Sequence, residues 1–98
     1  MRNLYYKNSK QQIKAVGVEP LNNYLLRVFF SNGEVKIFDV KPYLELKVFA
    51  PVKDKSFFAK VKTEFNTVVW NDRIDIDPEE LYWDSVPDLI STSNFKYG

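Results

Sequence analysis

The pattern of apolar and polar side chains predicts three β-strands in the first half of the chain. The first is expected over residues 13–20 and ends at Pro20, which cannot donate to a strand ladder. The second, over residues 24–30, is apolar at nearly every position, as is typical of a central strand. The third spans residues 34–40, with every second side chain from Val35 on one side of the sheet.

The turn between the second and third strands carries the strongest local signal. Asn32-Gly33 separates two runs that are rich in β-forming residues. Such a pair favours a type I′ turn, in which both residues have positive φ. The three strands are therefore predicted to form an antiparallel meander.

Shorter elements are expected in the second half of the chain. Asp54 can cap a helix by accepting a hydrogen bond from a backbone N–H of its first turn. Residues 66–67 are predicted to form the turn of a second hairpin, although their turn chemistry is poorer than that of Asn-Gly. In chain order we expect a helical turn at 41–44, a helix over 55–61, strands at 62–65 and 68–70, a short strand at 73–76 and a helix over 78–84.

The start of the last helix has a clear mechanism. Asp77 can accept a bond from the N–H of Glu80, and Pro78 occupies the first helical position, where a missing N–H costs nothing. Glu80 is predicted to reach back to the backbone of Asp77 in a capping box. We assign structural roles to the residues of this start, of the first turn and of the expected core around it: Asn32, Gly33, Trp70, Asp77, Pro78 and Leu81.

The length of 98 residues fits one domain. We predict an α+β fold with an antiparallel meander of three strands, a short helix, a second hairpin or strand pair and a short C-terminal helix. Residues 1–11 are polar and without a period, and are expected to form a loose arm. Residues 13–84 form the predicted folded core, and residues 85–98 a polar tail.

Composition argues against most catalytic chemistry. The chain has no Cys and no His, which excludes thiol nucleophiles, disulfides, the usual zinc ligands and imidazole bases. It has three glycines and no glycine-rich phosphate loop. The carboxylates of Asp72, Asp75, Asp77 and Glu79 could ligate a hard cation, but they lack the Gly and Glu positions of an EF-hand loop. We therefore expect a protein without enzymatic activity, cofactor or metal.

The first residues lack the apolar run of a signal peptide, and no window is long and apolar enough to cross a bilayer. The sequence thus predicts a cytoplasmic protein without membrane contact.

Charge is divided unevenly along the chain. Residues 1–70 carry a formal charge of +6, and residues 71–98 carry −5. Part of the acidic excess suits the start of a helix, where the macrodipole favours carboxylates. The remainder predicts an acidic surface that attracts a small basic protein. Candidate contact residues for such a partner are Asp75, Glu79, Glu80, Tyr82 and Trp83. The protein itself is expected to be a monomer or a homodimer.

A nucleic-acid-binding accessory domain is the alternative hypothesis. Lysines recur through the Lys41–Lys62 segment and alternate with aromatic residues such as Tyr43 and Phe57. Lysines can contact phosphates, and exposed aromatic rings can stack on bases. The chain has only three arginines, and burial of these rings in the core would remove the stacking surface.

Two motifs resemble a bacterial family known as domain of unknown function twenty-four forty-two. Its members share a second strand that ends in Phe-x-(Asn/Asp)-Gly, as in Phe30-Ser31-Asn32-Gly33, and a third strand that ends in Asp, here Asp39. They also share a closing motif Trp-x-x-Gly-x-Asp-(Ile/Leu)-x-Pro-Glu-x-Leu, which residues 70–81 match except for Arg73 in place of Gly.

The resemblance covers residues 16–82 and implies an α+β fold. Relatives are often encoded beside another small bacterial protein, in an arrangement similar to a toxin–antitoxin pair, which implies an antitoxin-like role. Some relatives carry a helix-turn-helix DNA-binding domain after this one.

Overall fold

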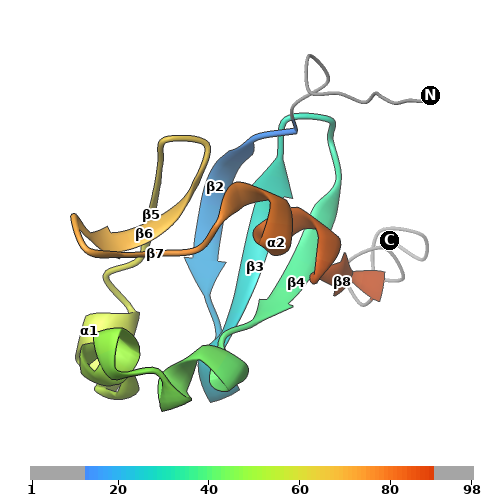
Figure 1. Cartoon of the computed structure of the whole chain (residues 1–98). Helices are drawn as coiled ribbons and strands as arrows, with labels where there is room; N and C mark the ends of the chain where they lie inside the picture. The colour runs from blue at the N-terminus through green and yellow to red at the C-terminus, as the bar shows by residue number, and fades with distance from the viewer. Residues whose placement is uncertain (1–12, 90–98) are drawn as a thin grey trace.

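The computed structural model describes residues 13–89, and two antiparallel sheets organise this part of the chain (Figure 1). The larger sheet has the strand order β2-β3-β4-β8, and the smaller has the order β5-β6-β7. The strands are β2 Ala15–Pro20, β3 Leu25–Phe30, β4 Val35–Asp39, β5 Lys62–Glu64, β6 Thr67–Asn71, β7 Ile74–Asp75 and β8 Val86–Pro87. The helices are the 3₁₀ segments η2 Asn22–Tyr24, η3 Lys41–Glu45 and η4 Lys47–Lys53, and the α-helices α1 Lys55–Phe58 and α2 Pro78–Trp83. The predicted α+β fold is confirmed.

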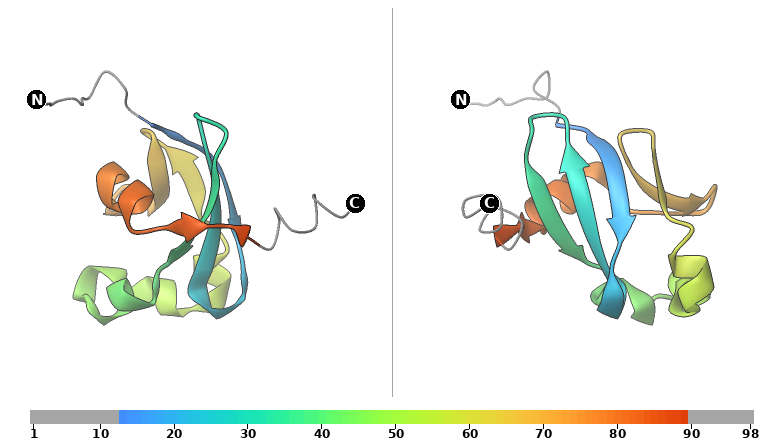
Figure 2. Two further views of the ribbon diagram at one scale, coloured as in Figure 1. Left: turned by 90° about the vertical axis from the view of Figure 1, so that its right-hand side faces the viewer. Right: turned by 180° about the vertical axis from the view of Figure 1, so that it is seen from behind.

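β3 lies at the centre of the larger sheet, as its apolar sequence predicted. It pairs with β2 on one side and β4 on the other. Leu26, Val28 and Phe30 point to one face and are buried, because side chains alternate along a strand. Figure 2 shows α2, the smaller sheet and the 3₁₀ segments on this face, so the core lies between them and the sheet.

The turn after β3 differs from the prediction. Gly33 has a φ of 92°, whereas the φ of Asn32 is not positive. Gly33 N–H donates to Phe30 O at 2.9 Å, and Phe30 N–H donates to Glu34 O at 2.9 Å. These bonds close a three-residue loop, in which only the last position needs a left-handed residue. The type I′ prediction for Asn32-Gly33 was therefore wrong, although the hairpin itself is confirmed.

A two-residue turn with positive φ at both positions occurs instead in the second hairpin. Phe65 and Asn66 have φ values of 55° and 70°, and Glu64 pairs directly with Thr67. The turn is one residue earlier than predicted. Phe65 is 81% exposed and gains no core contact for this conformation. Asn66 O accepts a bond from Ala15 N–H at 3.1 Å, which holds the hairpin beside β2.

Aromatic side chains fill the end of the core below the smaller sheet. Trp70 lies 5.8 Å from Phe49 and 6.2 Å from Phe58, measured between ring centroids. Its indole N–H donates to the carbonyl of Phe58 at 3.0 Å, which satisfies the polar atom of a buried ring. Ile76 and Leu81 are also buried, so the predicted core role of Trp70 and Leu81 is confirmed.

The chain after residue 84 corrects the predicted polar tail. Val86–Pro87 forms β8, which pairs with Lys36 and Ile37 of β4. The Asp88 side chain is only 3% exposed. Sequence reasoning missed this strand because its two residues are too few to show a period. Residues 90–98 of the tail, and residues 1–12 with the predicted arm, lie outside the described part of the chain.

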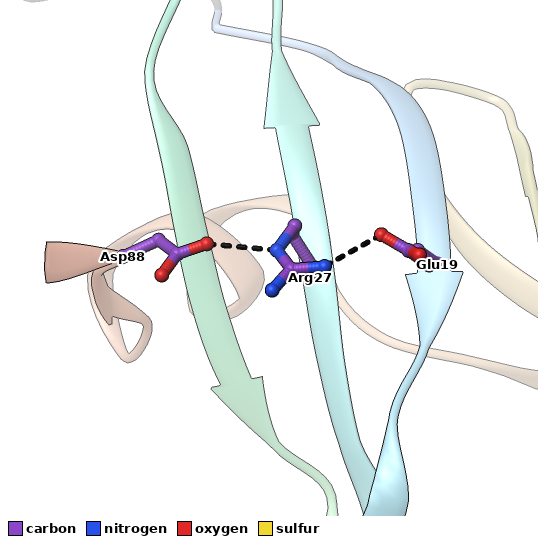
Figure 3. Close-up of polar contacts among 3 residues, drawn as sticks. All are labelled: Glu19, Arg27 and Asp88. Atoms are coloured by element: carbon purple, nitrogen blue, oxygen red, sulfur yellow. Dashed lines mark hydrogen bonds and ion pairs between the residues drawn. The ribbon is translucent and has the colours of Figure 1, made fainter. Parts of the chain in front are cut away.

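On the face of the larger sheet that is opposite α2, Arg27 of β3 binds the chain just after β8 (Figure 3). Its Nε lies 2.7 Å from a carboxylate oxygen of Asp88, and its Nη1 lies 2.7 Å from one of Glu19. Bonding to Asp88, and then to Glu19, raises the pKa of the guanidinium. The three residues come from β3, β2 and the chain just after β8, so one cation links three neighbouring segments.

Among residues 13–89, no helix is long and apolar enough to span a bilayer.

Candidate functional site

The start of α2 follows the capping chemistry that the sequence predicts. The Asp77 carboxylate accepts hydrogen bonds from Glu79 N–H at 3.1 Å and Glu80 N–H at 3.2 Å. Pro78 is the first helical residue. The chain before the helix is shaped by Asn71, whose side-chain oxygen accepts from the N–H groups of Arg73 and Ile74. This Asx-type turn explains how the position of Arg73 can be filled without glycine.

The outward side of α2 carries three carboxylates and one large aromatic ring. Residues four apart lie on the same helical face, which pairs Glu79 with Trp83 and Glu80 with Asp84. All four are exposed, whereas Leu81 on the inner side is fully buried. We call Glu79, Glu80, Trp83 and Asp84 the α2 face.

Trp83 is the most prominent side chain of the α2 face. It is 74% exposed, and its ring packs edge-on against Tyr82 with centroids 5.0 Å apart. Within residues 13–89, the carboxylates of Glu79 and Asp84 have no hydrogen-bond or ion-pair partner. Exposed aromatic rings are common at the centre of protein interfaces, and carboxylates without a partner attract positively charged surfaces. The α2 face offers both.

The Glu80 side chain is held by a hydrogen bond from η3. The hydroxyl of Tyr43, in η3, donates to its Oε1 at 2.6 Å. Burial raises the pKa of the Tyr43 phenol, and the bond to Glu80 and the charges of Asp84 and Asp77 raise it further. The predicted reach of Glu80 back to its own helix start is therefore replaced by a contact with η3.

Tyr82 is a structural residue within this site. Its ring packs edge-on against Phe30 at 5.1 Å, and its hydroxyl donates to a carboxylate oxygen of Glu34. That bond, followed by one from Asn32, lowers the pKa of Glu34. Bonding to Glu34, then burial, raises the pKa of Tyr82 itself. Tyr82 thus joins α2 to the β3–β4 hairpin and offers little free surface to a partner.

The last turn of α2 receives a cation from the larger sheet. The Lys36 ammonium donates to the carbonyl of Tyr82 at 2.9 Å and lies 3.8 Å from the centroid of the Tyr82 ring. Ser85 Oγ donates to the same carbonyl at 2.9 Å. A helix ends with unpaired carbonyls and partial negative charge, so both contacts stabilise it.

Apart from Tyr82, the predicted contact residues fall into two groups. The structure brings Glu79, Glu80 and Trp83 together on one helical surface. Asp75 is exposed on β7, before the helix begins. In the described part of the chain, no three acidic residues come close enough to hold a metal ion.

The Lys41–Lys62 segment does not expose a ladder of aromatic rings. Phe49 and Phe58 are buried, and Phe57 and Tyr43 pack partly into the core. Lys41 is engaged by the carbonyl of Asn23 and by Asp39. The lysines of η4 and α1 remain exposed.

Sequence reasoning missed the residues that hold the α2 face in place. Tyr43, Glu34 and Lys36 reach α2 from 37, 48 and 46 residues away along the chain. No local period or spacing encodes such contacts. The nearest signal is compositional, since a tyrosine in a polar segment such as Lys41–Glu45 needs a partner for its hydroxyl once the ring is buried.

Comparison with protein families gives one family description. The model of the family described as "Protein of unknown function (DUF2442)" matches residues 15–86. A comparison with curated proteins gave no match.

A solved structure with a similar fold is described as "Putative DNA Binding Protein NE0471 from Nitrosomonas europaea ATCC 19718". The two chains are 31% identical and superpose with a TM-score of 0.66. The match covers 86% of the present chain and 52% of that protein, so this chain spans about half of its length.

Proposed function

The chain belongs to the DUF2442 family of proteins of unknown function, and we propose that it is a non-enzymatic protein-interaction domain that binds a small basic protein. The α2 face is the proposed docking surface. The observation that carries this function is the 74% exposure of Trp83 between carboxylates that have no partner of their own among residues 13–89.

The chemistry of the α2 face selects the partner. Tryptophan is enriched among the residues that contribute most to binding energy in protein interfaces. Carboxylates around it attract a positively charged surface and repel a negatively charged one. Nucleic acid is therefore a poor occupant of this face, whereas a basic protein fits both its charge and its aromatic anchor.

The face is also fixed before a partner arrives. Tyr43 holds Glu80 from one side, and Glu34 and Lys36 hold Tyr82 from the other. A docking helix that is already ordered loses less conformational entropy on binding. This pre-organisation supports a binding role for a helix of only six residues.

Co-purification with the product of the neighbouring gene tests the proposal. We expect capture by the wild-type chain at moderate salt, and loss of capture by the double variant Glu79→Lys/Trp83→Ala. The matched control is Glu64→Lys/Phe65→Ala, which changes an exposed carboxylate and an exposed aromatic ring at the tip of the β5–β6 hairpin. Equal capture by all three proteins, or capture by none, would contradict the proposal.

Nucleic-acid binding through the Lys41–Lys62 segment is the second candidate function. It is favoured by the description of the solved relative as a putative DNA-binding protein, although half of that protein has no counterpart here. Burial of Phe49 and Phe58 leaves phosphate contacts as the main source of affinity.

A mobility-shift assay over a range of salt concentrations tests this candidate. Phosphate contacts predict binding that weakens as salt rises and that falls further in Lys53→Gln/Lys55→Gln. A shift that is insensitive to salt, or no shift, counts against it.

A further inference from the structure

The α2 face is linked through Tyr43 to a second exposed segment, the junction of η3 and η4. Tyr43 bonds to Glu80, and its carbonyl accepts a hydrogen bond from Leu46 N–H at 3.0 Å, so the junction of η3 and η4 is adjacent to α2. Figure 2 (left) shows α2 and the green η3–η4 segment projecting on the same side of the larger sheet.

This junction combines exposed apolar side chains with a cation. Leu46 and Val48 are 51% and 49% exposed. Lys47 lies between them, is exposed, and has no hydrogen-bond or ion-pair partner among residues 13–89. We call Leu46, Lys47 and Val48 the η3–η4 corner.

Each of the two surfaces therefore combines exposed apolar groups with a charged group, which is a carboxylate on the α2 face and the Lys47 ammonium at the corner. The α2 face presents an exposed ring with free carboxylates, and the η3–η4 corner presents exposed aliphatic groups with a free ammonium. In a two-fold dimer each residue i contacts a residue j of the other copy, and j contacts i in return. A surface that carries Glu79 at one place and Lys47, two residues from the exposed Glu45, at another meets this requirement when one copy is rotated onto the other.

We propose that a second copy of this chain binds here, with the α2 face of each copy on the η3–η4 corner of the other. Trp83 then packs on Leu46 and Val48 of the second copy, and Glu79 faces its Lys47. The proposal builds on the docking face described above. It adds that self-association covers this face and that a basic partner must displace the second copy.

Charge exchange between the two surfaces provides the test. Sedimentation equilibrium of the full chain should show a concentration-dependent dimer that weakens as salt rises, because exposed charges are screened. Glu79→Lys and Lys47→Glu should each raise the dimer dissociation constant by about tenfold or more, since each places like charges together. The double variant Glu79→Lys/Lys47→Glu should restore it to near the wild-type value.

Trp83 fluorescence gives a second measurement in the same samples. Because Trp70 is buried in the core, a blue shift of emission with rising protein concentration would report burial of Trp83, and Trp83→Ala should abolish it. Glu64→Lys is the control for a charge reversal outside the contact.

The proposal is overturned if the wild-type chain stays monomeric at all concentrations, or if the double variant associates no better than the single variants. Failure of the two proposals can be told apart. Partner capture that is lost in Glu79→Lys and is not rescued by Lys47→Glu supports the protein partner alone, whereas a rescued dimer without capture supports self-association alone.

Discussion

The hydroxyl of Tyr43 lies 2.6 Å from a carboxylate oxygen of Glu80, and this contact joins η3 to the exposed side of α2. Tyr43→Phe keeps the ring, which packs 5.3 Å from Phe49, and removes only the donor. We expect a loss of about 1 kcal/mol in the free energy of unfolding, the usual net value of one such bond. Denaturant unfolding measures it, and Glu79→Gln, which removes a first-turn charge but no hydrogen bond of the side chain, should cost less than Tyr43→Phe.

The same phenol makes stability depend on alkaline pH. The pKa of Tyr43 is raised above its ordinary value of 10.0, chiefly by burial. A raised folded-state pKa means that this contribution is complete below pH 10 and is lost as pH rises toward the folded pKa. Wild type should therefore lose more stability above pH 10 than Tyr43→Phe does. Parallel loss in both proteins would show that Tyr43 titrates as in the unfolded chain.

Glu34 is expected to control stability at acid pH through Tyr82. Its pKa is lowered from 4.5, first by the bond from Tyr82 and second by the bond from Asn32. The stabilisation is present above pH 4.5 and is lost as pH falls through the folded pKa. Thermal unfolding followed from about pH 6 downward, where carboxylates begin to take up protons, should show that the midpoint falls less steeply in Glu34→Gln than in the wild type. An unchanged acid slope would exclude Glu34 as its source.

Arg27→Met should loosen β8 more than the rest of the sheet. The substitution removes the cation next to the Asp88 carboxylate, which is 3% exposed on its side chain. Loss of a partner by a buried charged group costs about 1–3 kcal/mol. Hydrogen exchange of the Asp88 amide, which donates to Val35 O at 3.0 Å, should accelerate most. Glu19→Gln removes the exposed end of the same network and is expected to cost less than about 1 kcal/mol.

Phe65→Asn should stabilise the protein. Phe65 has a φ of 55°, a left-handed conformation that costs an ordinary L-residue about 1–2 kcal/mol, and asparagine tolerates it better. Its ring is 81% exposed, so little packing is lost. We expect a rise in the thermal midpoint. Gly33→Ala provides the opposite sign, because Gly33 has a φ of 92° and alanine is strained there. A lowered midpoint in Phe65→Asn would mean that the ring makes a stabilising contact.

The sequence by itself determined the elements whose causes are local. Alternation defined β2 and β4, because one face of each strand must be apolar to be buried, and a short apolar run defined β3. Asp77 and Pro78 determined where α2 begins, since the cap and its backbone donors lie within three residues. Leu81 and Trp70 were assigned to the core because they are large apolar residues within predicted elements. The acidic character of α2 was visible in its sequence.

Tertiary structure alone decided how these elements meet. β8 is two residues long and forms because it pairs with β4 and because Arg27 binds Asp88, the residue that follows it. The two-residue hairpin turn with positive φ at both positions lies at Phe65 and Asn66, because the pairing of β5 with β6 leaves two residues for that turn. Of five candidate contact residues, the fold gathered Glu79, Glu80 and Trp83 on one face and committed Tyr82 to Glu34. Contacts across 37 to 48 residues are fixed by packing, which no local pattern encodes.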